Sequence, residues 1–155
     1  MPIEVCSMCG QRFKVSTKDW KLTHHSSDKV DTLYCVKLWI EKRRSLYDPM
    51  ELGATRIATT TSNHPIKTAG DFRSNLEFNF SLWLEQNGFD YLYENWVFPV
   101  HNGWYIPDFY ILEHGCFIET KGLWAAGSKK KLTNIYSRYP SMSLLLLPWT
   151  LGKKL

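Results

Sequence analysis

A strand-like stretch between residues 105 and 122, YIPDFYILEHGCFIETKG, constrains the fold more than any other part of the sequence. It is mostly apolar and aromatic, and a short turn at Glu113-His114-Gly115 divides it, so it predicts a β-hairpin. It also carries Asp108, Glu119 and Lys121. Charged side chains inside strands cost free energy unless they are paired, solvated or bound to something. The folded chain must therefore pair, solvate or bind these three groups. The alternative to a site is a surface pair of Glu119 and Lys121 on an exposed sheet face, with Asp108 at a strand edge.

The alternation of side chains along a strand places these charges on one face. Residues two apart point the same way, so Glu119 and Lys121 share a face. If the turn pairs Leu112 with Gly115, Asp108 lies opposite Glu119. If it pairs Glu113 with Cys116, Asp108 lies opposite Lys121. We expect Asp108 beside Glu119 and Lys121 in either case.

Neighbouring carboxylates repel each other, and a divalent cation removes that cost. Oxygen ligands suit Mg²⁺ or Mn²⁺, and the adjacent Lys121 can stabilise charge on a phosphate. Pro107 removes one backbone donor from the ladder, as is typical of a strand edge or bulge. This chemistry is that of phosphodiester hydrolysis with a metal-activated water.

Periodicity and turn residues predict a regular second half of the chain. The predicted order is a helix from Ser74 to Asn87-Gly88, strands over 91–97, 104–112 and 116–121, a helix from Ser128 to about Tyr139, and a strand over 142–147. Three consecutive strands followed by a helical crossover imply a mixed sheet flanked by helices. Ser74 and Glu77 also fit a capping box, in which Glu77 only returns a hydrogen bond to the helix start.

The N-terminal part carries a different signature, the C-x-x-C motif of Cys6 and Cys9. A structural zinc site needs four ligands, and Cys35 with His24 (or His25) completes the set. A segment this short cannot build a core of its own, so a metal staple is expected. Cys35 also begins a predicted amphipathic, basic helix that extends to about Arg44, and the alternative is a set of ordinary buried thiols.

Composition divides the chain into three parts. Residues 53–70 are rich in Thr, Ser, Gly and Pro and predict a linker or arm between a zinc-stapled module over 1–52 and a core over 71–155. The net charge is +4, and all of this excess lies in residues 1–70, which is compatible with a polyanionic partner. The candidate DNA-contacting residues are Lys42, Arg43, Arg44, Arg73, Lys129 and Lys130.

Three segments in the second half resemble those of one family. FRSNLE (72–77), PDF (107–109) and ETKGLW (119–124) are similar, in order and spacing, to the signature segments of the T7-type endonuclease I family of PD-(D/E)xK nucleases. The resemblance implies a restriction-endonuclease-like core of order α-β-β-β-α-β. It also implies catalytic roles for Glu77, Asp108, Glu119 and Lys121, with Mg²⁺ or Mn²⁺ held by Asp108, Glu119, the Thr120 carbonyl and Glu77.

The same resemblance implies a homodimer that cleaves branched DNA, in which the helix carboxylate comes from the partner chain. Whether Glu77 acts within its own chain stays open. The N-terminal zinc segment has no counterpart in that family, so a site-specific, homing-type endonuclease is an alternative, and a non-catalytic zinc-stapled DNA-binding protein is a second. No small-molecule substrate or membrane association is expected. No signal sequence or long apolar run stands out, so we expect an intracellular, cytoplasmic, phage-encoded protein.

Overall fold

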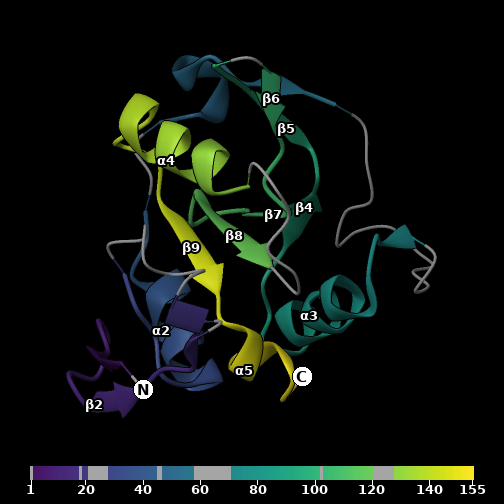
Figure 1. Cartoon of the computed structure of the whole chain (residues 1–155). Helices are drawn as coiled ribbons and strands as arrows, with labels where there is room; N and C mark the ends of the chain where they lie inside the picture. Colours follow the sequence, from purple (N-terminus) through teal and green to yellow (C-terminus); the bar gives the residue numbers. More distant parts are fainter. Residues whose placement is uncertain are drawn as a thin grey trace.

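The computed structural model describes residues 2–17, 19–20, 28–44, 47–57, 71–101, 103–120 and 128–155, with the backbone alone for Ser128 and Lys129. Its centre is a four-stranded mixed sheet of order β4-β7-β8-β9 (Figure 1). The bounds are β4 Tyr91–Tyr93, β7 Phe109–Ile111, β8 Cys116–Thr120 and β9 Leu144–Leu147. Strands β4, β7 and β8 are antiparallel, and β9 runs parallel to β8 because helix α4 (Ser128–Arg138) carries the chain back between them. The predicted mixed sheet with flanking helices is confirmed.

The hairpin β7–β8 forms in the first of the two registers that the sequence allows. Ile111 pairs with Cys116, and Phe109 pairs with Ile118. One further step in this register brings Asp108 opposite Glu119. Its turn includes Glu113, whose φ of 69° is unusual for a residue with a side chain.

Helix α3 (Asn75–Gln86) begins and ends where the sequence predicts. The Ser74 side chain accepts a hydrogen bond from the backbone N–H of Glu77, which satisfies one of the free donors of the first turn. Past the helix end, Gly88 takes a φ of 77°, a left-handed conformation that glycine adopts without strain.

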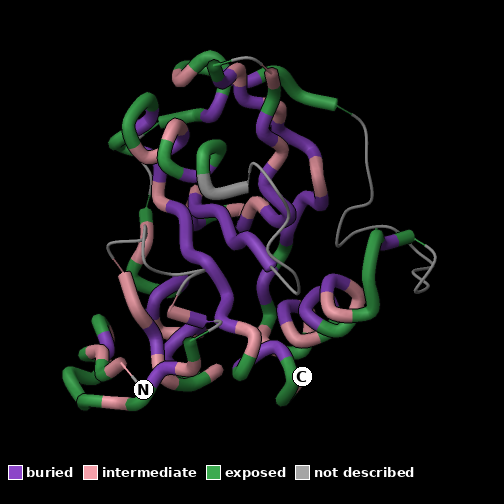
Figure 2. The backbone as a smooth tube through the Cα atoms, in the orientation of Figure 1, coloured by how far each residue is buried: buried purple, intermediate pink, exposed green. Residues whose placement is uncertain are grey.

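Both faces of the central sheet are buried (Figure 2). On one face, Phe109 and Ile118 pack in a hydrophobic cluster with side chains of α2 (Leu33–Glu41) and α3. On the other face, Phe117 packs with Leu132 and Ile135 of α4. The face that carries Glu119 is therefore also covered, because α4 crosses it on the way to β9.

The sequence predicts two long strands, over 91–97 and 104–112. This prediction is wrong, because each of them is interrupted and forms two shorter strands. The first divides into β4 and β5 (Trp96–Val100) at Glu94, whose φ is 46°. The second divides into β6 (Gly103–Tyr105) and β7 around Pro107, which has no N–H to donate to a ladder. The Glu94 N–H donates to the Asp108 carbonyl oxygen at 2.9 Å, so the two breaks lie side by side.

Beyond these breaks, a second sheet of order β3-β5-β6 forms. Strand β3 (Thr55–Arg56) pairs with β5, so the start of the predicted linker belongs to this sheet. Residues 58–70 lie outside the described part of the chain.

The described N-terminal part includes the hairpin β1 (Ile3–Val5) and β2 (Arg12–Lys14), helix α2 and the 3-10 helix η1 (Pro49–Leu52). Helix α2 begins two residues before the predicted start because Thr32 caps it, and it ends at Glu41 rather than near Arg44. Its buried Trp39 and Ile40 join the same hydrophobic cluster as α3 and the sheet. The division into three parts at residues 52 and 70 stays a prediction.

A buried carboxylate ties the N-terminal part to the C-terminus. Asp19 is 1% exposed and accepts hydrogen bonds from the backbone N–H of Trp149 at 2.5 Å and from the Thr150 hydroxyl at 2.7 Å. These bonds hold the first turn of α5 (Trp149–Gly152). Among the described residues, no helix has the length and apolar character required to cross a membrane.

Substitution of Phe109 tests how much this core contributes to the stability of the protein. Its ring is fully buried and lies 5.2–5.4 Å, centroid to centroid, from the rings of Phe80, Tyr91 and Tyr93. Phe109→Ala should lower the free energy of unfolding by about 3–5 kcal/mol, measured by urea denaturation. Tyr34→Ala, at a 66% exposed position of α2, should change it by less than about 0.5 kcal/mol. Equal losses in the two variants would contradict this packing.

Candidate active site

The topology brings three strand ends together at one end of the central sheet. The register pairs Tyr93 with Phe109 and Phe109 with Ile118, so the end of β4, the start of β7 and the end of β8 coincide. Glu94 and Asp108 therefore lie at the same edge as the last residues of β8. The first turn of α3 adds a further carboxylate there, that of Glu77.

Three of these carboxylates form one cluster. Oxygen atoms of Glu77, Glu94 and Asp108 all lie within 4.8 Å of one another. Glu77 is 7% exposed and Asp108 is 3% exposed. Such an arrangement of oxygen donors has the spacing and chemistry of a site for a hard divalent cation.

Asp108 is the most constrained of the three. Its Oδ2 accepts hydrogen bonds from the Thr120 N–H at 2.7 Å and from the Thr120 hydroxyl at 2.8 Å. Burial, with the nearby charges of Glu119 and Glu77, raises the pKa of the Asp108 carboxyl well above its usual value, although the bonds from Thr120 oppose the shift. The carboxylate form is therefore costly in the protein alone.

Glu77 is held by donors from two directions. Its Oε2 accepts a hydrogen bond from the backbone N–H of Arg73 at 2.9 Å and another from the Tyr93 hydroxyl. The bond to Arg73 lies one residue before the helix cap at Ser74, so the carboxylate does bond near the helix start, as in a capping box. The same carboxylate also faces Asp108 within its own chain.

Glu119 lies next to the cluster and has its own donor. The hydroxyl of Tyr105 donates to Glu119 Oε2 at 2.5 Å, and both residues are buried. Burial is the largest cause of a strongly raised pKa of the Tyr105 hydroxyl, and the charge of Glu119 adds to it. The tyrosine thus stays protonated and donates to the carboxylate.

Glu94 is the acidic residue that the sequence analysis missed. Its Oε1 lies 3.0 Å from Nε of Arg73, whose charge balances part of the cluster. The pKa of Arg73 is raised, first by the charge of Glu94. The adjacent pair Glu94-Asn95 was a usable signal, because both residue types are depleted in strands and mark a break.

A cleft of about 340 Å³ opens beside Glu119. Its lining residues are Arg73, Trp104, Tyr105, Ile106, Glu119, Lys131 and Leu132. Two of them, Arg73 and Lys131, are basic and could contact phosphates at the carboxylates. The indole of Trp104 is 66% exposed.

The other predicted DNA-contacting residues lie elsewhere. Lys130 lines a different depression with Thr133. Arg43 donates to Asp28 Oδ2 at 2.9 Å and stacks over Trp39, and Arg44 donates to backbone carbonyls. Lys42 is exposed at the end of α2. DNA contacts by these residues stay predictions.

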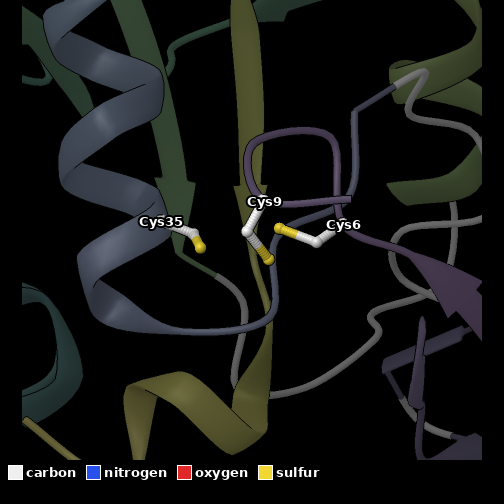
Figure 3. Close-up of side chains that lie close together, drawn as sticks. All are labelled: Cys6, Cys9 and Cys35. Carbon is white, nitrogen blue, oxygen red and sulfur yellow. The ribbon is translucent and has the colours of Figure 1, made fainter. Parts of the chain in front are cut away.

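Some predicted site residues cannot be placed. Lys121, His24 and His25 lie outside the described residues, as does the side chain of Lys129. The three predicted zinc ligands among the cysteines, Cys6, Cys9 and Cys35, do lie together and form a group separate from the carboxylate cluster (Figure 3).

Comparison with known proteins identifies a family and two relatives. The family model for phage endonuclease I matches residues 57–149. Endonuclease I of Escherichia phage T7 is 40% identical over 86 residues, which cover 53% of this chain and 57% of that protein. Endodeoxyribonuclease 1 of Enterobacteria phage T3 is 41% identical over 80 residues, which cover 49% and 52%. The chain thus spans about half the length of the curated relatives it matches, and no solved structure matches it.

Fold and site together define a mixed α and β protein whose central sheet ends in a cluster of carboxylates, of which Glu77 and Asp108 are buried. The family match covers more than half of the chain and spans every one of these carboxylates. The chain belongs to the phage endonuclease I family. The resemblance predicted from the three sequence segments is confirmed.

The raised pKa of Asp108 predicts how stability changes with pH in the protein kept free of metal by chelator. The folded pKa lies above the ordinary value of 3.8, so the native state binds more protons than the unfolded state between the two. The free energy of unfolding should therefore fall as pH rises through this window, by at most about 1.4 kcal/mol per pH unit for one group. Denaturation curves at a series of pH values measure this.

Asp108→Asn removes the titrating group and should flatten that dependence, leaving the variant more stable than the wild type at neutral pH without metal. Glu113→Gln removes an exposed carboxylate from the same hairpin and should keep the wild-type profile. Parallel curves for wild type and Asp108→Asn would contradict the burial of a costly charge at this position.

Proposed function

We propose that this protein is a DNA endonuclease that hydrolyses phosphodiester bonds with Mg²⁺ or Mn²⁺. The observation that carries the proposal is the cluster of Glu77, Glu94 and Asp108, with Glu119 beside it, inside the region that matches the phage endonuclease I family. The names of the T7 and T3 relatives state an endonuclease and an endodeoxyribonuclease. DNA is therefore the substrate on which the proposal should be tested.

The residues present fit a divalent cation. The donors are carboxylate oxygens, which hard cations prefer, and the buried Asp108 is costly to ionise without a compensating charge. Asp108, Glu77 and Glu119 would hold the ion, with the Thr120 carbonyl and Glu94 as further oxygen donors. A bound ion supplies Lewis-acid polarisation of the phosphate and lowers the pKa of a water.

The protein's own residues orient these donors before any substrate arrives. Thr120 fixes one oxygen of Asp108 with two hydrogen bonds, Tyr105 fixes Glu119, and Tyr93 fixes Glu77. Donors held in place in this way do not have to reorganise during the reaction.

Arg73 and Lys131 line the neighbouring cleft and are suited to bind the DNA backbone. Lys121, implied by the family resemblance as the catalytic lysine, follows Thr120 directly in sequence. We assign it the stabilisation of charge on the scissile phosphate.

Branched DNA is the substrate that the family resemblance favours, with a homodimer making paired cuts in opposed strands. Oxygen atoms of Glu77 and Asp108 of the same chain lie within 4.8 Å of each other in this structure, which supports a role for Glu77 within its own chain. A Glu77 supplied by the partner chain is the alternative.

Site-specific cleavage of duplex DNA is a second candidate. It is favoured by two observations: residues 1–56 precede the family match, and the basic excess of the chain lies within residues 1–70. An added basic segment could bind DNA flanking the cut and select a target.

A cleavage assay separates these candidates. Purified protein with Mg²⁺ is incubated with a four-way junction, with the matched linear duplex and with phage genomic DNA. We expect cutting of the junction at least about 100-fold faster than of the duplex, since a bent branch point fits two paired sites without the cost of deforming a duplex. Cutting of one genomic locus, with the junction ignored, would support the site-specific candidate and reject the junction.

Substitution of the clustered carboxylates tests the catalytic assignment. Asp108→Asn and Glu77→Gln should each slow cleavage at least about 100-fold, because each removes a charged oxygen donor, and DNA binding measured by gel shift should persist. Glu94→Gln should also slow it and raise the Mg²⁺ concentration required. Glu113→Gln should leave cleavage unchanged. A wild-type cleavage rate in Asp108→Asn would contradict the assignment of the active site to this end of the sheet.

A further inference from the structure

Three thiols meet outside the carboxylate site (Figure 3). Cys6 and Cys9 belong to the turn between β1 and β2, and Cys35 belongs to the first turn of α2. Their sulfur atoms all lie within 4.8 Å of one another. Thiolates that share a tetrahedral zinc ion at about 2.3 Å are roughly 3.8 Å apart, so small side-chain rotations suffice to reach that geometry.

The turn that carries Cys6 and Cys9 is held by backbone hydrogen bonds. The Cys6 N–H donates to the Gln11 carbonyl at 2.9 Å. The Gly10 N–H donates to the Cys6 carbonyl at 2.9 Å, and Gly10 takes a φ of 74°. A non-glycine residue would be strained there.

Cys35 is positioned by helix α2. It belongs to the first turn of that helix. Its own N–H is bonded to the Thr32 side chain at 3.1 Å, which fixes the start of the helix. Cys6 and Cys35 are 2% and 3% exposed, whereas Cys9 is exposed and gives access from solvent.

We propose that Cys6, Cys9 and Cys35 bind one structural zinc ion that staples the β1–β2 hairpin to helix α2. A disulfide would use only two of the three thiols, whereas a metal ion uses all of them. The fourth ligand predicted from the sequence, His24 or His25, lies outside the described residues, so the proposal rests on the three cysteines.

The staple has a structural role rather than a catalytic one. The exposed Ile3 and Val5 of β1 and the short strands of this hairpin bury little apolar surface. Helix α2, by contrast, inserts Val36, Trp39 and Ile40 into the core that covers the sheet. A two-stranded hairpin of this size is marginally stable alone, so zinc would stabilise it by linking it to a helix that is anchored in the core.

Metal analysis of the full-length protein tests the proposal. Protein purified under reducing conditions and exchanged into buffer with added zinc should contain one zinc per chain, and its cobalt-substituted form should show the thiolate-to-cobalt charge-transfer absorption. Cys9→Ala should lower zinc affinity at least about 100-fold, measured by competition with a chromophoric chelator. Cys9 is exposed, so this substitution leaves the core intact.

Cys116→Ala is the matched control. Burial in β8 raises the pKa of Cys116 to about 12, and its thiol belongs to the hydrophobic core. This variant should keep one zinc per chain and the full cobalt absorption. Limited proteolysis gives a second measurement on Cys9→Ala. Without zinc, the N-terminal hairpin of this variant should be cleaved faster than that of the wild type, while the temperature at which the core unfolds stays the same.

Two results would overturn the proposal. One is wild-type protein that takes up no zinc under these conditions. The other is Cys9→Ala that binds zinc as tightly as the wild type. Neither readout depends on DNA cleavage, so failure of the zinc proposal and failure of the nuclease proposal are distinguishable.

Discussion

The repulsion among clustered carboxylates, two of them buried, is the constraint on which the rest of this structure depends. Glu77, Glu94 and Asp108 are brought within 4.8 Å of one another, and Asp108 is nearly inaccessible to water. An apolar sheet does not gather such groups for stability, because each buried charge costs free energy unless it is compensated. The cost arises at one end of one sheet. Proteins are expected to depart from the rules of stable packing at their functional sites, so this end of the sheet is the candidate site.

The backbone breaks in both strands serve the same end. Glu94 adopts a left-handed conformation and donates its N–H to the Asp108 carbonyl, while Pro107 ends the ladder before β7. These two breaks split the strands into a central sheet and a second sheet and turn the carboxylates toward each other. The aromatic cluster around Phe109 provides the rigid base that holds this end of the sheet.

Much of this could be predicted from the sequence, for local reasons. Ser74 and Gly88 mark the ends of α3. The short turn after Leu112 left two registers open, both with Asp108 on the face of Glu119, and the structure has the one that places Asp108 opposite Glu119. The role of Glu94 could not be predicted from strand periodicity, since its approach to Glu77 arises from packing of α3 against the sheet.

The roles of Tyr93 and Tyr105 as hydrogen-bond donors could not be predicted either. Their sequence pattern is that of ordinary core residues, and only the structure shows which carboxylates their hydroxyls contact. Lys131 rather than Lys130 lines the cleft beside Glu119 because of the rotation of α4 on the sheet, which three consecutive lysines do not specify.

The most direct test of the central claim is anomalous diffraction from crystals soaked in Mn²⁺. The account predicts an anomalous peak bounded by oxygens of Asp108 and its neighbouring carboxylates, at distances of about 2.2 Å. A map with no peak there, and with the side chains of Glu77 and Asp108 turned to separate surfaces, would contradict it.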